Sequence, residues 1–236
     1  MPSDIPIPNQ ADYHRPSQLF EFGAKATLLE DTLFVSAALF QQDRVIPGLG
    51  SSFNNAIVRG FEIEADYQPS RNFYVNVGYS YLDARVHGSP FVNQPFPVTD
   101  PRQWVDPTNI SKGVLTDNGT TLPNKNYREP GLPTHAFNLL MSYKIPTKLG
   151  TFSAILGNTV TGPMDLGYGG YIRIPWQYEM DLTFAYKTPD DRFEAKLALL
   201  NLTDQKNWNP PNPVYSYDSV VQQWPFHIEG TITFRF

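Results

Sequence analysis

The chain has 236 residues, a net charge of −5 and no cysteine. The absence of cysteine excludes a disulfide framework and a thiolate metal site, and the negative charge without a basic block argues against a nucleic-acid partner. Aromatic residues make up 14% and charged residues only 17%, yet the mean hydropathy is −0.36, a combination that is unusual for a water-soluble domain. The longest apolar run, LFVSAALF, is far shorter than the ~18 residues of a membrane-spanning helix.

The first segment, residues 1–16, reads MPSDIPIPNQADYHRP and contains neither a charged start nor an apolar stretch, so it does not form a signal peptide. Two explanations fit: a protein that stays inside the cell, or a longer chain whose first part is missing. We interpret residues 1–16 as the remnant of an extracellular loop that precedes the first strand.

From there to the C-terminus, apolar and polar side chains alternate in segment after segment. In the stretch 61–68, Phe61, Ile63, Ala65 and Tyr67 alternate with polar residues, three of them acidic. A period of two residues places each set on one face of a strand. No segment has the pattern of a helix of three turns. We expect about nine strands, at residues 20–28, 33–42, 61–68, 73–83, 135–144, 152–160, 178–187, 193–200 and 226–236.

The connections between these strands alternate between short and long. The short ones are rich in Pro, Asp, Gly and Lys, as tight turns require; one of the long ones covers 87–132. An up-and-down meander with this alternation places every short connection at one end, which is the plan of an outer-membrane barrel. The predicted fold is therefore all-β: an antiparallel up-and-down transmembrane β-barrel segment in residues 17–236, with 87–132 as its long extracellular loop.

Aromatic side chains flank the short turns on the apolar face. A girdle at the level of the lipid headgroups requires such residues, although aromatic residues also favour strands in general. A soluble β-sandwich or lipocalin-like barrel alternates as well, but seldom combines one very long loop with tight turns at its other end. The flanking residues are Tyr67, Phe73, Tyr143, Phe152, Tyr186, Phe193, Phe234 and Phe236, whereas the first turn has Leu28 and Leu33.

Four stretches resemble TonB-dependent receptors of the bacterial outer membrane. They occur in the order and spacing of that family from about Arg15 onward, and the resemblance implies a barrel of about 22 strands around a plug domain. It also implies that assembly machinery recognises a C-terminal aromatic residue, here Phe236. The stretches are RPSQLFEFGAKATLLEDTLFVSAALFQQDR, GFEIEADYQPSRNFYVNVGYSYLDARV, LALLNLTDQKNW and TITFRF.

The sequence departs from this family in its small number of strands and in lacking a plug and a TonB-box segment. Nine strands cannot close in an antiparallel manner, and an open sheet leaves unsatisfied backbone groups in lipid. We therefore expect an incomplete barrel that is the C-terminal part of a receptor, as a gene fragment, a truncated sequence or one piece of a split barrel.

No catalytic constellation, phosphate loop or pair of metal-spaced histidines occurs, so the chain is not predicted to be an enzyme or to hold a cofactor or metal. His14, His87, His135 and His227 are scattered. Rings and guanidinium groups bind aromatic or anionic ligands well. The candidate substrate contacts in the loops are Trp104, Tyr127, Arg128 and Trp208.

The expected function is uptake of a scarce nutrient across the outer membrane of a Gram-negative bacterium. The resemblance implies a ferric siderophore, a cobalamin or an oligosaccharide as the ligand. It also implies as partners the outer-membrane lipid, the missing plug domain and barrel strands, and the TonB complex, which acts through the plug. A structural or adhesive barrel fragment without transport is the main alternative, and a small outer-membrane enzyme is a third.

Overall fold

The computed structural model describes residues 17–47, 53–89, 91–93, 119–121, 123–168, 173–209 and 221–236. Among these residues, no helix is long and apolar enough to cross a membrane. Nine long strands dominate: β1 (Gln18–Leu28), β2 (Leu33–Pro47), β3 (Phe53–Ser70), β4 (Phe73–Gly88), β8 (His135–Thr147), β9 (Gly150–Thr161), β12 (Gln177–Lys187), β13 (Phe193–Leu200) and β16 (His227–Phe234).

The described parts of the connections between them contain seven short strands. Three pairs form two-stranded sheets of their own, and β7 joins the main sheet by pairing with β4. The short strands are β5 (Phe91–Asn93), β6 (Gly119–Thr121), β7 (Lys125–Arg128), β10 (Met164–Asp165), β11 (Arg173–Ile174), β14 (Trp208–Asn209) and β15 (Val221–Gln222).

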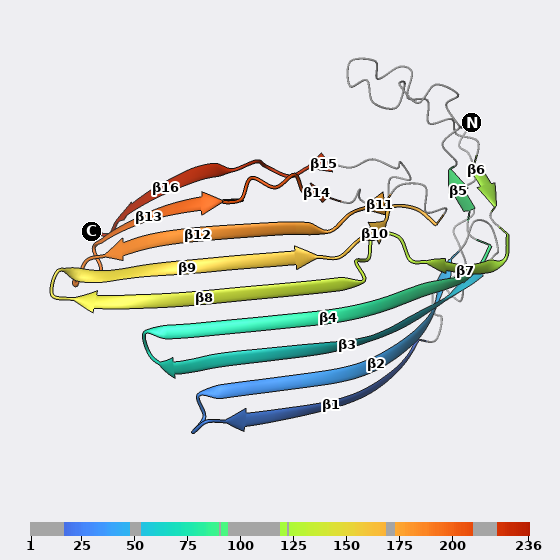
Figure 1. Ribbon diagram of the computed structural model, residues 1–236, viewed down its shortest axis with the longest axis horizontal. Helices are drawn as coiled ribbons and strands as arrows, with labels where there is room; N and C mark the ends of the chain where they lie inside the picture. Colours follow the sequence, from blue (N-terminus) through green and yellow to red (C-terminus); the bar gives the residue numbers. More distant parts are fainter. Residues whose placement is uncertain are drawn as a thin grey trace, which may run out of the picture.

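The long strands form one curved antiparallel sheet in which each pairs with the next long strand along the chain (Figure 1). All four short turns lie at one end, at the left of Figure 1 together with the C-terminus, and the long connections lie at the right. We call these the turn end and the loop end. Within the described residues, nothing pairs with the free edges of β1 and β16. The prediction of an up-and-down sheet of about nine strands that does not close is confirmed.

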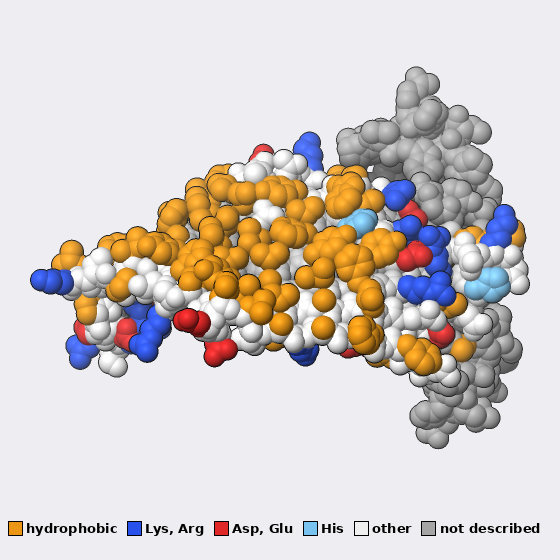
Figure 2. All heavy atoms as spheres, turned by 60° about the horizontal axis from the view of Figure 1, so that its bottom comes forward, with side chains coloured by type: hydrophobic (Ala, Val, Ile, Leu, Met, Phe, Trp, Pro, Cys, Tyr) orange, Lys and Arg blue, Asp and Glu red, His pale blue; other side chains and the backbone are white. Residues whose placement is uncertain are grey.

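Register gathers the apolar side chains on one face, which we call the outer face. Phe61 lies opposite Leu39 on one side and Tyr81 on the other, and residues directly opposite in a ladder share a face. Phe22 remains 78% exposed and Ile232 67% exposed, so protein does not cover this face. Figure 2 shows a broad, nearly continuous apolar surface, far larger than soluble monomers expose.

A belt of aromatic rings crosses the outer face at the turn end. The ring centroids of Tyr67 and Phe73 lie 6.5 Å apart, and those of Phe73 and Tyr143 lie 6.2 Å apart. Farther along the sheet, Phe152, Tyr186, Phe193 and Phe234 continue the belt at successive centroid distances of 4.8, 6.3 and 5.1 Å. Seven of the eight rings that the sequence predicts beside the short turns, all but Phe236, therefore form one row across seven strands.

At the loop end, β3 and β4 continue well beyond their predicted bounds. Here Ala56, Val58, Ala84 and Val86 are buried on the inner face, and Val86 is completely buried. β8 ends its pairing with β4 at His135, and β7 takes its place farther along the strand. The sheet therefore extends past the apolar band into the region of the loops.

Candidate functional site

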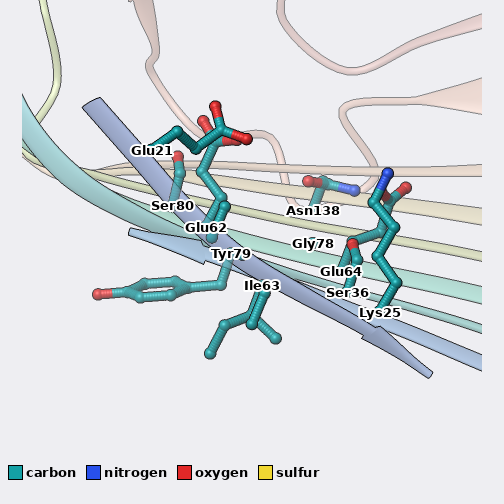
Figure 3. Close-up of a pocket in the computed structure, with 13 residues that line it drawn as sticks. Glu21, Lys25, Ser36, Glu62, Ile63, Glu64, Gly78, Tyr79, Ser80 and Asn138 are labelled. Carbon is teal, nitrogen blue, oxygen red and sulfur yellow. The ribbon is translucent and has the colours of Figure 1, made fainter. Parts of the chain in front are cut away.

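Four carboxylates on the inner face of β1 and β3 form a group that we call the acidic strip. Glu62, Glu64 and Asp66 follow one another at every second position of β3, and Glu21 joins them from β1. Figure 3 draws Glu21 and Lys25 from β1 with Glu62 and Glu64 from β3 around one hollow, two strands apart in the sheet. Four acids beside one lysine give this part of the inner face a net negative charge.

A hydrogen-bond network holds the acidic strip at its turn-end side. The Tyr74 hydroxyl donates to Asp66 Oδ1 at 2.5 Å, and Asn76 Nδ2 donates to Asp66 Oδ1 at 3.0 Å and to Glu64 Oε1 at 3.1 Å. Asn138 Nδ2 on β8 donates to Asn76 Oδ1 at 3.2 Å. The network joins β3, β4 and β8 and fixes two of the four carboxylates, Glu64 and Asp66.

Beside this network lies an open hollow of about 440 Å³ that includes Glu21, Lys25, Glu62 and Glu64 in its lining. Gly78 forms part of its floor, where a side chain would collide with the amide of Asn138. The glycine therefore lets the Asn138 side chain lie across the sheet. Polar groups that face an open hollow can bind water or a second polypeptide.

A second group of polar side chains, the loop-end cluster, lies where the sheet enters the loops. It contains Arg44, Tyr127, Glu129 and Tyr168. Tyr127 lies opposite the buried Val86 and thus on the inner face. Its ring packs edge-on against Tyr168 at 6.5 Å, and the Tyr168 hydroxyl donates to Glu129 Oε2 at 3.4 Å. Arg44 Nε is buried and has no hydrogen-bond acceptor among the described residues.

Burial changes the acid–base behaviour of the loop-end cluster. Desolvation raises the pKa of Glu129 above its usual 4.5, against the opposing effects of the positive charge of Arg44 and the hydrogen bond from Tyr168. Desolvation and the neighbouring charge of Glu129 raise the pKa of Tyr168 to about 12. The cluster therefore combines a hard-to-ionise phenol, a carboxyl group and a guanidinium group at the mouth of the inner face.

The structure separates the residues that the sequence suggests as substrate contacts. Tyr127 and Arg128 are neighbours on β7 and so point to opposite faces: Tyr127 lies on the inner face, whereas Arg128 lies on the outer face and donates to the Thr134 hydroxyl. The Tyr127 hydroxyl donates to the Pro123 carbonyl oxygen at 2.6 Å. Trp104 lies outside the described residues. Substrate contact by these residues remains a prediction.

Trp208, the fourth candidate, packs within the loops. It covers a small buried core formed by Met164, Leu166 and Ile174, and its backbone N–H donates to the side-chain oxygen of Gln177. Its ring is partly buried. Trp208 therefore stabilises the β10–β11 region, and substrate contact by this ring too remains a prediction.

Sequence reasoning missed the role of two buried asparagines in the LALLNLTDQKNW stretch. Asn201 Nδ2 donates to the carbonyl oxygens of Gln205 at 2.9 Å and Trp224 at 3.1 Å. Asn207 bonds to the backbone of Tyr178 with both ends of its amide. The sequence signal for this role is the pattern Asn-x-x-x-x-x-Asn directly after a strand. Asparagine amides can hydrogen-bond to backbone groups where no strand partner is present. This stretch anchors the base of the last loop.

Sequence reasoning also missed Arg44, Glu129 and Tyr168. Arg44 continues the alternation of β2 two residues past the predicted strand end, which is the one signal that could have identified it. Among the described residues, no group of His, Cys, Asp or Glu side chains is arranged to hold a metal ion. His135 instead stacks on Trp176 at 5.4 Å, and its Nδ1 is bonded to the Tyr79 hydroxyl at 2.8 Å.

Comparison with solved structures relates the sheet to several receptors. The siderophore receptor PiuA from Acinetobacter baumannii superposes with a TM-score of 0.69 at 16% identity over 92% of this chain and 28% of that one. The ferric-catecholate import receptor Fiu from E. coli K12, in its closed form, gives a TM-score of 0.62 at 20% identity over 94% and 28%. The ferric yersiniabactin uptake receptor FyuA from Yersinia pestis gives 0.61 at 15% identity over 93% and 30%.

The chain thus spans less than a third of the length of each of these receptors. No curated protein matches it in sequence. A family model described as "TonB dependent receptor-like, beta-barrel" matches residues 17–202, which is most of the chain and includes every long strand except β16. The chain therefore belongs to the TonB-dependent receptor-like β-barrel family, whose members lie in the outer membrane of Gram-negative bacteria.

Proposed function

We propose that this chain forms the C-terminal wall of an outer-membrane transporter that takes up a ferric siderophore. One observation carries the proposal. Over 92 to 94% of its length, this chain superposes on receptors whose names specify siderophores or their iron complexes. Cobalamin and an oligosaccharide are the alternative nutrients that the sequence leaves open.

Strand direction defines what must complete the barrel. β1 and β16 both run from the loop end to the turn end, so the strand beside each free edge must run the other way. Antiparallel closure therefore requires an odd number of additional strands. A ring of copies of this chain would instead place β16 of one beside β1 of the next in parallel, which disfavours closure by copies.

The acidic strip supports a partner inside the barrel. The carboxylates of this strip face the interior, and Tyr74 and Asn76 hold two of them, Asp66 and Glu64, in place. In an interior filled with water, these carboxylates are free to bind cationic groups. We infer that a plug domain presents basic and amide side chains to Glu21, Glu62 and Glu64, and that the TonB complex acts through this plug. The loops then bind the ligand, and the barrel wall supports both.

The loop-end cluster supports ligand binding from the inner face of the mouth. Ferric siderophores offer anionic oxygen donors and often aromatic rings, and Arg44, Tyr127 and Tyr168 provide a cation and two phenols suited to both. Among the sequence-derived candidates, Tyr127 is the residue that belongs to this cluster. We propose Tyr127 rather than Arg128 as a direct ligand contact.

The test is uptake by cells whose only receptor is the complete protein that contains this chain. Radiolabelled ferric catecholate, ferric hydroxamate, cobalamin and a maltooligosaccharide are offered in parallel, with and without a functional TonB complex. TonB-dependent accumulation of one iron complex supports the proposal, and accumulation of cobalamin or the sugar instead reassigns the nutrient. Absence of uptake for every probe, with normal insertion of the barrel, favours a structural or adhesive barrel.

A further inference from the structure

Three arginines gather on the outer face at the loop end, and we call them the arginine cluster. Arg59 lies on β3, Arg85 on β4 and Arg128 on β7. Arg85 and Arg128 are directly opposite in the ladder, and Arg59 lies opposite Asp83, two residues from Arg85 on β4. Three adjacent strands therefore bring these cations together.

Register places the arginine cluster on the same face as the apolar surface. Phe61 and Tyr81 belong to the outer face, and Arg59 and Arg85 lie two and four residues farther along the same strands. Because side chains two apart share a face of a strand, these arginines point outward as well. Figure 2 shows blue side chains gathered directly beyond the loop end of the orange surface.

A second aromatic row lies between the apolar surface and the arginine cluster. The ring centroid of Tyr81 lies 5.7 Å from that of Phe61 and 5.3 Å from that of His135, which stacks on Trp176 at 5.4 Å. Trp176 is 58% exposed. Rings of this kind with polar tips mark the level at which hydrocarbon gives way to headgroups.

Strand geometry sets the distances between these levels. The eight residues from Phe73 to Tyr81 correspond to about 27 Å of strand, or about 21 Å of height at a tilt of ~40°, close to the ~25 Å apolar band of outer-membrane barrels. Arg59 and Arg85 then lie about 5 and 10 Å beyond the second aromatic row. The arginine cluster is therefore at the height of the lipid headgroups.

Of the three arginines, Arg85 forms an ion pair with an acid, whereas Arg59 and Arg128 bond to neutral groups and keep their positive charge unneutralised in the described part of the chain. Arg85 Nε bonds to Asp83 at 2.7 Å, whereas Arg59 Nε donates to Gln41 Oε1 at 2.8 Å and Arg128 donates to Thr134, both neutral groups. Asp43, the other nearby acid on this face, accepts from Gln41 Nε2 at 3.1 Å. Within the described residues, no carboxylate forms an ion pair with Arg59 or Arg128.

The direct opposition of Arg85 and Arg128 is costly without an anion, because like charges opposite each other destabilise a ladder. We propose that the arginine cluster binds phosphate groups of lipid headgroups in the outer leaflet of the outer membrane. Guanidinium groups fixed by neutral partners keep further N–H donors for phosphate oxygens, which they bind in a bidentate manner. This inference rests on the membrane orientation in the proposed function, in which the loop end faces outward, and not on the identity of the nutrient.

The test measures lipid binding to the complete barrel in phosphatidylcholine nanodiscs. The probes are bisphosphorylated lipid A and its dephosphorylated form, followed by native mass spectrometry or by titration with a fluorescent derivative. The test variant is Arg59→Gln with Arg128→Gln, which spares the Arg85–Asp83 pair. The matched control is Arg71→Gln with Arg192→Gln, which removes the same charge at the turn end. Resistance to unfolding by heat in detergent verifies that each variant is folded.

We expect the wild type and the control to bind the phosphorylated lipid about tenfold more tightly than the dephosphorylated one, since each cation near a charged surface adds appreciable attraction. The test variant should lose most of that preference. Equal binding of both lipids by the wild type, or an equal loss in the control, would overturn the proposal. Competition by inorganic phosphate as effective as that by lipid A would show a site for free phosphate instead. Siderophore uptake is not part of this measurement, so either proposal can fail alone.

Discussion

Asn207 and Tyr178 exchange two hydrogen bonds at the loop end of β12. Asn207 Nδ2 donates to the Tyr178 carbonyl oxygen at 2.8 Å, and the Tyr178 backbone N–H donates to Asn207 Oδ1 at 3.2 Å. The ladder between β12 and β13 begins only at Leu182 and Leu199, so the asparagine amide takes the place of a strand partner. It links the base of the last loop to the sheet.

Replacing Asn207 by leucine should lower the free energy of unfolding of the complete barrel by about 2 to 4 kcal/mol, because two backbone groups lose their partners in a buried place. Asn207 is 3% exposed. Denaturant-induced unfolding measures the loss. Gln222→Ala, which removes an exposed amide from the neighbouring β15, serves as the control and should change little; a similar loss in both would remove the special role of Asn207.

Arginine substitutions on adjacent residues of β12 should differ according to face. Leu182 lies opposite Leu156 and Leu199 on the outer face, whereas Thr183 points inward. Leu182→Arg should cost about 2 to 4 kcal/mol because it places a charge in the apolar band, and Thr183→Arg should cost much less. Unfolding of the two variants in the same lipid gives the comparison, and equal or reversed costs would show that the faces are assigned the wrong way round.

Two aromatic residues near the C-terminus should separate assembly from stability. Phe234 packs on Phe193 at 5.1 Å, whereas the Phe236 side chain is fully exposed. In the complete receptor, Phe236→Ala should reduce the amount inserted in cells far more than the melting temperature of the inserted barrel. Phe234→Ala should lower the melting temperature, since it removes about 1.5 to 3 kcal/mol of apolar contact with the belt and the lipid.

Quantitative immunoblots of outer membranes and thermal unfolding of the purified variants provide the two readouts. Parallel losses in both readouts for Phe236→Ala, or no change in either, would make Phe236 an ordinary member of the belt.

Glu129 should make the stability of the loop-end cluster depend on pH. Its pKa in the folded protein is raised above the usual 4.5, so the protonated form is favoured on folding. The resulting contribution to stability is fully present below about pH 4.5, the usual pKa of a glutamate, and is lost as the pH rises through the raised pKa of the folded protein. Glu129→Gln imitates the protonated form, so the stability of this variant relative to the wild type should increase as the pH rises.

Melting temperatures of the wild type and Glu129→Gln between pH 4 and pH 8 test this expectation, with the exposed turn residue Glu30→Gln as the control. A difference that stays constant, or that shrinks as the pH rises, would contradict the assigned direction of the pKa shift.

The strand pattern was predictable wherever lipid and water lie on opposite sides of the sheet. Phe61, Ile63 and Tyr67 alternate with acids because one face contacts hydrocarbon and the other contacts a polar interior. At the loop end this contrast vanishes: Ala56, Ile57 and Val58 are all apolar, since the inner positions Ala56 and Val58 are buried there. Because the period of two is lost, the strand predicted at 61–68 begins eight residues later than β3, which starts at Phe53.

The candidate site was less predictable because its members meet only through the fold. Arg44, Glu129 and Tyr168 are separated by long stretches of chain, and their pairing depends on the return of β7 to β4 and on the β10–β11 region. Tyr127 and Arg128 look equivalent as loop residues. Only their place on a strand reveals that Tyr127 lies on the inner face and Arg128 on the outer face.

The return of β7 to β4 also makes the longest loop modular. The outermost pair of that short ladder joins Gly88 to Lys125, so the excursion between them starts and ends at one fixed neck. Because the neck is held by the ladder, chain inserted or deleted within 89–124 does not shift the register of the sheet below it, and lengthening a closed loop costs little. The length of this loop can therefore vary without disturbing the sheet, and the chain beyond this neck is a suitable place to insert a foreign epitope.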